Sequence, residues 1–174
     1  GNSTSFANNA GGGILVRGAA LTITTSTVSN NANTGAGSAG GGVVMANGNL
    51  SITESTISGN TTTAQAGGIG FDSNGNAVTA TIINSTISGN SASFGGGIAN
   101  FRGTLNLRHS TVTLNTAPAS NGSGVASFSD GSSIADTVVL SSIISANTNS
   151  DIDNILSLTG VNTFTSSGFN LVGT

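Results

Sequence analysis

Residues 50–60 read LSITESTISGN, and close counterparts of this stretch stand at residues 21–31 (LTITTSTVSNN) and 80–90 (ATIINSTISGN). More divergent copies occupy residues 105–115 and 137–147, with the same spacing between their apolar positions and their asparagine. Sequences that repeat at intervals of about 20 to 50 residues form architectures in which one supersecondary unit stacks on the next. This repeat therefore decides the fold class.

Two short motifs mark the repeats. The first is an apolar residue, two variable residues and an asparagine, and it also occurs at Phe6–Asn9. Its asparagines are 22, 29, 30, 25 and 32 residues apart, at Asn9, Asn31, Asn60, Asn90, Asn115 and Asn147. The second is a glycine-rich run before an aliphatic residue, which is Ile14, Val43, Ile69, Ile98 or Val125.

The spacing within a repeat separates strands from loops. Leu50 and Ile57 are seven positions apart, as are their equivalents in all five copies, whereas the segment between the asparagine and the glycines varies in length. Constant separations are typical of paired strands held in register, and variable ones of loops. Apolar and small polar residues alternate within the constant segments, as expected for strands. We therefore predict an all-β, right-handed parallel β-helix of about five to six coils, since parallel crossovers are almost always right-handed.

Equivalent residues of successive coils are expected to form columns that point into the core, at a spacing of about 4.8 Å. The glycines are expected at corners where the backbone takes a positive φ. The recurrent asparagine is also expected to tolerate positive φ, and its amides to hydrogen-bond from coil to coil. The predicted inward columns are Leu21, Leu50, Ala80, Leu105 and Thr137; Ile23, Ile52, Ile82, Leu107 and Val139; and Val28, Ile57, Ile87, Val112 and Ile144.

The domain organisation follows from where the repeats end. We predict one solenoid domain over residues 1–174, with repeats to about residue 147 and an atypical C-terminal cap over about 148–174. No glycine pair follows Asn147, and a terminal repeat that departs from the consensus is typical of a cap. The chain opens at Gly1 without a methionine or signal peptide, which indicates a processed product or a piece of a longer protein.

Composition excludes several classes of function. Charged residues make up 5% of the chain, lysine is absent and the formal net charge is −3, so a nucleic-acid partner or an anionic membrane surface is not expected. No apolar run approaches the roughly 18 residues of a membrane span. Cysteine is absent, which excludes disulfides, and 36% of the residues are apolar and regularly placed, unlike a disordered chain.

The paired motifs, glycines before an aliphatic residue and [FIV]-x-x-N, resemble the repeats of bacterial polymorphic outer membrane proteins and of related autotransporter-passenger-type surface proteins. The resemblance covers nearly the whole chain up to Asn147. It implies a secreted β-helix displayed at the cell surface, with an adhesive or structural role. This sequence has Ile or Val at most positions where that family often has Phe.

The chemistry-bearing residues do not assemble into a predicted catalytic site. Glu54 and His109 fall in one column, but two coils apart at about 10 Å, which is too far for a hydrogen-bonded pair. Arg102 and Asp130 are expected to form a surface ion pair. We therefore predict no enzyme activity and no catalytic, cofactor or metal site, with a polysaccharide lyase or hydrolase, or a carbohydrate-binding protein, as the alternative.

Two patterns in the sequence suggest cation binding, and each also has a structural interpretation. Residues 67–72 read GGIGFD and match the start of the calcium nonapeptide, but calcium rolls need consecutive copies, so a repeat corner is favoured. Asp151 and Asp153 could bind a cation, but two carboxylates on a polar loop are expected to be solvated.

The remaining features concern the surface. An outward row at Thr27, Thr56, Thr86 and Thr111 raises the alternative of an ice-binding solenoid, although threonine also favours exposed strands. The leading hypothesis is a non-enzymatic structural or adhesive rod, extracellular or at the cell surface, whose partners are glycans, surface proteins and other copies of itself in end-to-end filaments. The loops at residues 32–39 and 72–78 are the predicted contact sites.

Overall fold

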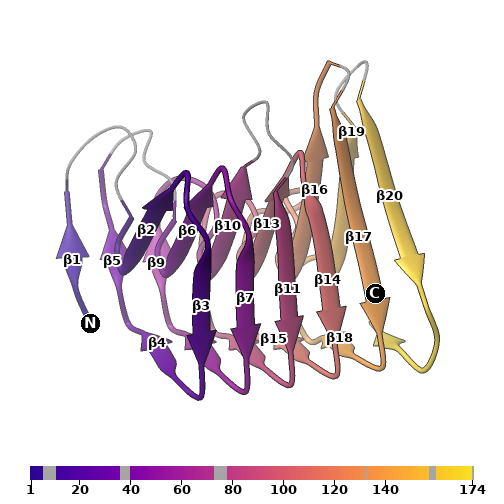
Figure 1. The fold of residues 1–174 in the computed structure, drawn as a ribbon, viewed down its shortest axis with the longest axis horizontal. Helices are drawn as coiled ribbons and strands as arrows, with labels where there is room; N and C mark the ends of the chain where they lie inside the picture. Colours follow the sequence, from indigo (N-terminus) through magenta and orange to yellow (C-terminus); the bar gives the residue numbers. More distant parts are fainter. Residues whose placement is uncertain (6–10, 36–39, 73–77, 132, 157–159, 174) are drawn as a thin grey trace.

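The computed structural model describes residues 1–5, 11–35, 40–72, 78–131, 133–156 and 160–173. The chain winds into a solenoid in which each turn contributes one strand to each of three parallel six-stranded sheets (Figure 1). This confirms the predicted all-β, parallel β-helix with three strands per coil. No helix in the described ranges is long and apolar enough to cross a membrane.

The three sheets follow the sequence motifs. The glycine sheet contains β2 (Ile14–Arg17), β6 (Val43–Ala46), β10 (Ile69–Asp72), β13 (Ile98–Phe101), β16 (Val125–Ser129) and β19 (Ile152–Leu156). The middle sheet contains β3 (Leu21–Thr24), β7 (Leu50–Thr53), β11 (Thr79–Ile83), β14 (Thr104–Arg108), β17 (Ile134–Leu140) and β20 (Val161–Ser166). The threonine sheet contains β4 (Thr27–Ser29), β8 (Thr56–Ser58), β12 (Thr86–Ser88), β15 (Thr111–Thr113), β18 (Ile143–Ser145) and β21 (Leu171–Val172).

The predicted inward columns are confirmed. Ile57, Ile87 and Val112 pair in register in the threonine sheet and are fully buried. In the middle sheet, Leu50, Ala80 and Leu105 pair in the same way, and so do Ile52, Ile82 and Leu107. These columns form one continuous apolar core along the solenoid axis, because a single coil cannot bury its own apolar face and stacking does so.

A short fourth sheet was not predicted. Its strands are β1 (Ser3–Thr4), β5 (Ala32–Asn33) and β9 (Thr61–Thr62), each beginning directly after an asparagine. The start of the predicted loop 32–39 is therefore a strand. The sheet also identifies the first asparagine of the series as Asn2, because Ser3 pairs with Ala32 and the Asn2 N–H donates to Asn31 Oδ1 at 2.9 Å. The predicted first member, Asn9, lies outside the described residues.

The corners differ from the prediction in which residue takes positive φ. The repeated asparagine does not; the residue before it does, with φ of 55° at Asn30, 62° at Gly89 and 56° at Leu114. A second set of positive-φ residues joins the middle and threonine sheets. We call it the corner ridge, and it consists of Thr25, Glu54, Asn84, His109, Ser141 and Phe169.

The glycines of each run have two separate roles. In three of the runs the first glycine takes positive φ, at Gly40, Gly95 and Gly122, and Ala66 takes it before Gly67. The last lies against the neighbouring coil: a Cβ on Gly97 would stand 2.6 Å from Gly124 O and 2.9 Å from Asn115 Nδ2. We call this position the inner glycine column, and its members are Gly13, Gly42, Gly68, Gly97 and Gly124.

Replacing Gly97 by alanine is expected to cost about 3 kcal/mol of unfolding free energy, because backbone atoms of the next coil cannot move away from the added methyl. Gly89→Ala is the matched control. Gly89 has positive φ but its nearest atom to an added Cβ is 3.9 Å away, so only the backbone strain of about 1 kcal/mol is expected. Chemical denaturation of both variants measures the difference. Equal losses would mean that close approach does not explain the inner glycines.

The segment predicted as a C-terminal cap continues the solenoid as a further coil. β19, β20 and β21 pair in register with β16, β17 and β18. This coil is nevertheless atypical. Of the eight large apolar residues that are exposed in the described chain, four lie in this coil: Val161, Phe169, Leu171 and Val172.

Candidate functional site

The repeated asparagines form a buried ladder that runs through the solenoid. Asn60 donates both its backbone N–H, at 2.9 Å, and its side-chain Nδ2, at 3.0 Å, to Asn90 Oδ1. The same Nδ2 donates its other hydrogen to Val28 O of the preceding coil at 3.0 Å. This pattern recurs from coil to coil and confirms the predicted ladder, whose members are Asn31, Asn60, Asn90, Asn115 and Asn147.

A second ladder was missed in the sequence. Ser26, Ser55 and Ser85 each donate their backbone N–H to the Ser Oγ of the next coil at 3.1 Å. The series continues through Ser110 to Ser142, whose N–H donates to Asn170 Oδ1 at 2.9 Å. The sequence signal for this ladder is a serine directly after each of the first five members of the corner ridge, always five residues before the repeated asparagine.

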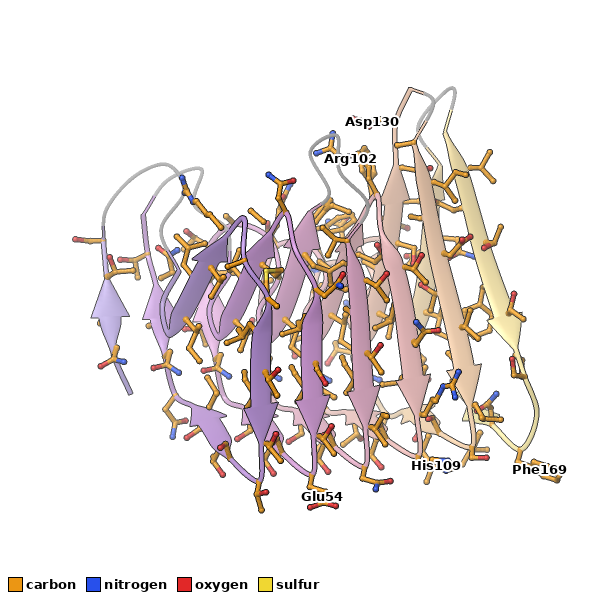
Figure 2. All side chains as sticks on the ribbon, in the orientation of Figure 1. Glu54, Arg102, His109, Asp130 and Phe169 are labelled. Carbon is orange, nitrogen blue, oxygen red and sulfur yellow. The ribbon has the colours of Figure 1, made fainter. Side chains whose placement is uncertain are left out.

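The candidate acid–base residues, Glu54 and His109, lie apart on the surface (Figure 2). Glu54 and His109 are both exposed members of the corner ridge, with Asn84 in the coil between them. Figure 2 shows them separated along one edge of the solenoid. A general acid–base pair requires hydrogen-bond reach, so this arrangement does not support one.

Arg102 and Asp130 form the predicted ion pair, with Nη1 3.2 Å from Oδ2 (Figure 2). Their side chains are 26% and 45% exposed. An exposed pair of this kind contributes at most about 1 kcal/mol, because water and salt screen it. The pair fastens two neighbouring coils at the surface.

The calcium-like stretch at residues 67–72 is a repeat corner. Gly68 belongs to the inner glycine column, and Ile69–Asp72 form β10 of the glycine sheet. No group of three histidine, cysteine or acidic residues that could hold a metal ion is found in the part of the chain that the structure describes. Most of the predicted contact site at residues 72–78 lies outside that part.

A polar cluster lies in the interior of the glycine sheet, where the apolar column of Met45 and Phe71 changes to Asn100 and Ser127. Asn100 Nδ2 donates to Asp136 O at 2.9 Å, and Ser127 Oγ lies 2.8 Å from Thr137 Oγ1. These side chains are fully buried and satisfy one another. Amides and hydroxyls alone supply no acid or base, so the cluster has a structural role.

Asp151 corrects the expectation of solvated carboxylates. It is only 3% exposed, and its Oδ1 accepts hydrogen bonds from the N and Nδ2 of Asn147 at 3.0 and 2.7 Å. Asp153 is partly exposed in β19. The sequence signal for Asp151 was its place directly before Ile152, the aliphatic position that glycine precedes in earlier coils.

The threonine face is regular over four coils. Thr27, Thr56, Thr86 and Thr111 pair in register, and so do Ser29, Ser58, Ser88 and Thr113. Ile143 and Leu171 continue the first row as apolar residues. The face is therefore a regular array of hydroxyl groups that ends at an apolar edge.

Comparison with known proteins identifies the family. A family model described as a right-handed β-helix region matches residues 2–139, which is most of the chain. Neither the curated proteins nor the solved structures gave a match. The resemblance to polymorphic outer membrane and autotransporter proteins is not shown by these comparisons. The parallel strand order agrees with this family model on the β-helix fold, and this chain belongs to the right-handed β-helix family.

Proposed function

We propose that this chain is a non-enzymatic structural or adhesive rod of a secreted bacterial surface protein. One observation carries the proposal: the recurrent asparagines and serines form hydrogen bonds between neighbouring coils. These polar groups therefore hold the solenoid together. Such ladders give a stiff solenoid rather than a reactive site. The fold is compatible with a surface repeat protein, and the paired sequence motifs support export and display.

The corner ridge supports an adhesive role. Its members stand one coil apart, all but the partly buried Ser141 are exposed, and their side chains differ from coil to coil. A stiff ridge with varied side chains is suited to contact with glycans or surface proteins. Binding of the purified chain to arrays of glycans and matrix proteins tests adhesion, and hydrolysis or elimination of polysaccharides in the same samples would favour the carbohydrate-active alternative.

The two ends of the solenoid support end-to-end association of copies. Three core columns end on incompletely buried apolar side chains at the N-terminal end, which are Ile14, Leu21 and Val28. The same columns end on Ile152, Phe164 and Val172 at the C-terminal end. A second copy stacked in register would bury both sets, and unlike ends in contact build filaments rather than closed oligomers.

Sedimentation velocity over a range of concentrations, with negative-stain imaging, tests the filament. We expect the mean mass to rise with concentration and rods of increasing length to appear, because each contact leaves a free end. A monomer that persists at high concentration, with no rods, would remove the filament and leave the adhesive role.

A second candidate function, ice binding, is favoured by the regular hydroxyl rows of the threonine sheet. Their spacing is about 4.8 Å between coils and about 7 Å along a strand, so the face can order water molecules. Thermal hysteresis of the purified chain measures this directly. Freezing behaviour equal to that of a charge-matched globular protein would reject it.

A further inference from the structure

In the last coil, Asp151 takes the place of the next asparagine of the ladder. Asn115 donates its N and Nδ2 to Asn147 Oδ1 at 3.0 and 2.9 Å. Asn147 makes the same two bonds, at 3.0 and 2.7 Å, to Asp151 Oδ1. The carboxylate thus does for Asn147 what an asparagine of the next coil does everywhere else.

The backbone of Asp151 does not come from the asparagine corner. It belongs to the inner glycine column, because the Val125 N–H donates to Asp151 O just as the Ile98 N–H donates to Gly124 O. In the five earlier coils this position is glycine, and a Cβ on Gly124 would stand 2.7 Å from Asn147 Nδ2. A side chain in this column and an asparagine in the same coil therefore exclude each other.

Other residues of the last coil accommodate the aspartate that replaces glycine at position 151. A Cβ on Gly173 would collide with Asp151 Oδ2, so glycine leaves the room that the carboxylate needs. The serine ladder changes its acceptor in the same coil, from serine hydroxyls to the amide of Asn170. In this coil the asparagine ladder ends on an aspartate and the serine ladder ends on an asparagine. The strands of the same coil nevertheless continue in register.

We propose that Asp151 is a stop residue for the asparagine ladder. Its carboxylate fills the side-chain position that an asparagine of a following coil needs, so a second copy of the chain cannot extend the ladder while Asp151 is in place. The part that concerns a second copy rests on the proposed end-to-end association. In an in-register stack the incoming residue is Asn2, which already donates its N–H to the ladder at Asn31 Oδ1.

Asp151 therefore sets the strength of the junction. With the carboxylate present, the apolar columns and strand edges of two copies meet, but the ladder is interrupted between them. Without it, the incoming Asn2 side chain can accept both bonds from Asn147. Self-association is then stronger, although each isolated molecule has lost the acceptor that satisfies Asn147.

The test compares Asp151→Gly, which restores the residue of the inner glycine column, with Asp153→Gly. The control removes the same charge from the same strand segment without touching the ladder. Amide exchange followed by NMR measures how well Asp151 protects the end of the ladder. We expect the Asn147 backbone and side-chain N–H groups to exchange at least tenfold faster in Asp151→Gly than in Asp153→Gly. Sedimentation velocity measures the association between copies. We expect Asp151→Gly to associate at least tenfold more strongly than Asp153→Gly.

The outcomes separate the two claims. Unchanged exchange at Asn147 overturns the stop residue, whatever the sedimentation shows. Faster exchange with association no stronger than in Asp153→Gly, while the unmodified chain does associate, overturns its control of stacking. If every form stays monomeric, the end-to-end association is rejected, and so is the claim that Asp151 controls stacking. Fast exchange in Asp151→Gly would then still support Asp151 as the stop residue of the ladder.

Discussion

Ile87→Asp is expected to leave the chain largely unfolded at room temperature. Ile87 is fully buried in the threonine sheet, in register between Ile57 and Val112. A carboxylate there would face stacked aliphatic side chains with no cation to pair it, at a cost above about 4 kcal/mol. This is comparable with the whole stability of a domain, about 5 to 15 kcal/mol. Far-UV circular dichroism and urea denaturation measure the loss.

Thr86→Asp is the matched control, since it adds the same charge one residue away on the outward, partly exposed face. We expect a loss of about 1 kcal/mol, from the lower strand propensity of aspartate. The milder Thr56→Ala should behave similarly. If Ile87→Asp and Thr86→Asp destabilise the chain equally, the assignment of inward and outward faces is wrong.

The fold could be predicted because its main determinant is periodic. A constant separation such as Leu50 to Ile57 fixes which residues share a column, and a slip by one residue would move every apolar side chain to the solvent face. The same alignment predicted the ladder of Asn60 and Asn90. Sequence spacing therefore contains the register of the three sheets.

Three features of the structure could not be predicted, because they depend on distances between coils. Positive φ and close approach both select glycine, so the sequence does not distinguish Gly95, which has positive φ, from Gly97, which lies against its neighbour. The first ladder position was assigned to Asn9 because the motif there looked complete, whereas Asn2 makes the bond. Asp151 was interpreted as solvated because its burial depends on a contact with Asn147 that only the stacked coils create.

The low charge of the chain follows from the same construction. A solenoid of stacked coils places equivalent side chains about 4.8 Å apart along every column. A lysine or glutamate that recurred in one outward column would stand beside its own copies, and like charges at that distance repel. Threonine, serine and asparagine can recur, because hydroxyl and amide groups both donate and accept hydrogen bonds. The low charge thus reflects the repeat.

Asn90→Ala is expected to cost about 4 kcal/mol of unfolding free energy. The variant removes the acceptor of the Asn60 N–H and Nδ2, and the donor to Ile57 O and to Asn115 Oδ1. Buried groups that lose a partner cost about 1 to 3 kcal/mol each. Asn106→Ala, on the partly exposed face of β14, is the control, with an expected loss within about 0.5 kcal/mol. Urea denaturation measures both.

Two further variants separate hydrogen bonding from packing and test cooperation along the ladder. Asn90→Leu refills the space without the amide, so we expect it to be no more stable than Asn90→Ala; a clear rescue by leucine would mean that Asn90 acts by filling volume. Asn31→Ala should cost less than Asn90→Ala, because the ladder bond that Asn31 Oδ1 accepts comes from Asn2, which is exposed. Hydrogen-bonded chains strengthen one another toward their middle, so equal losses at Asn31 and Asn90 would show that the rungs act independently.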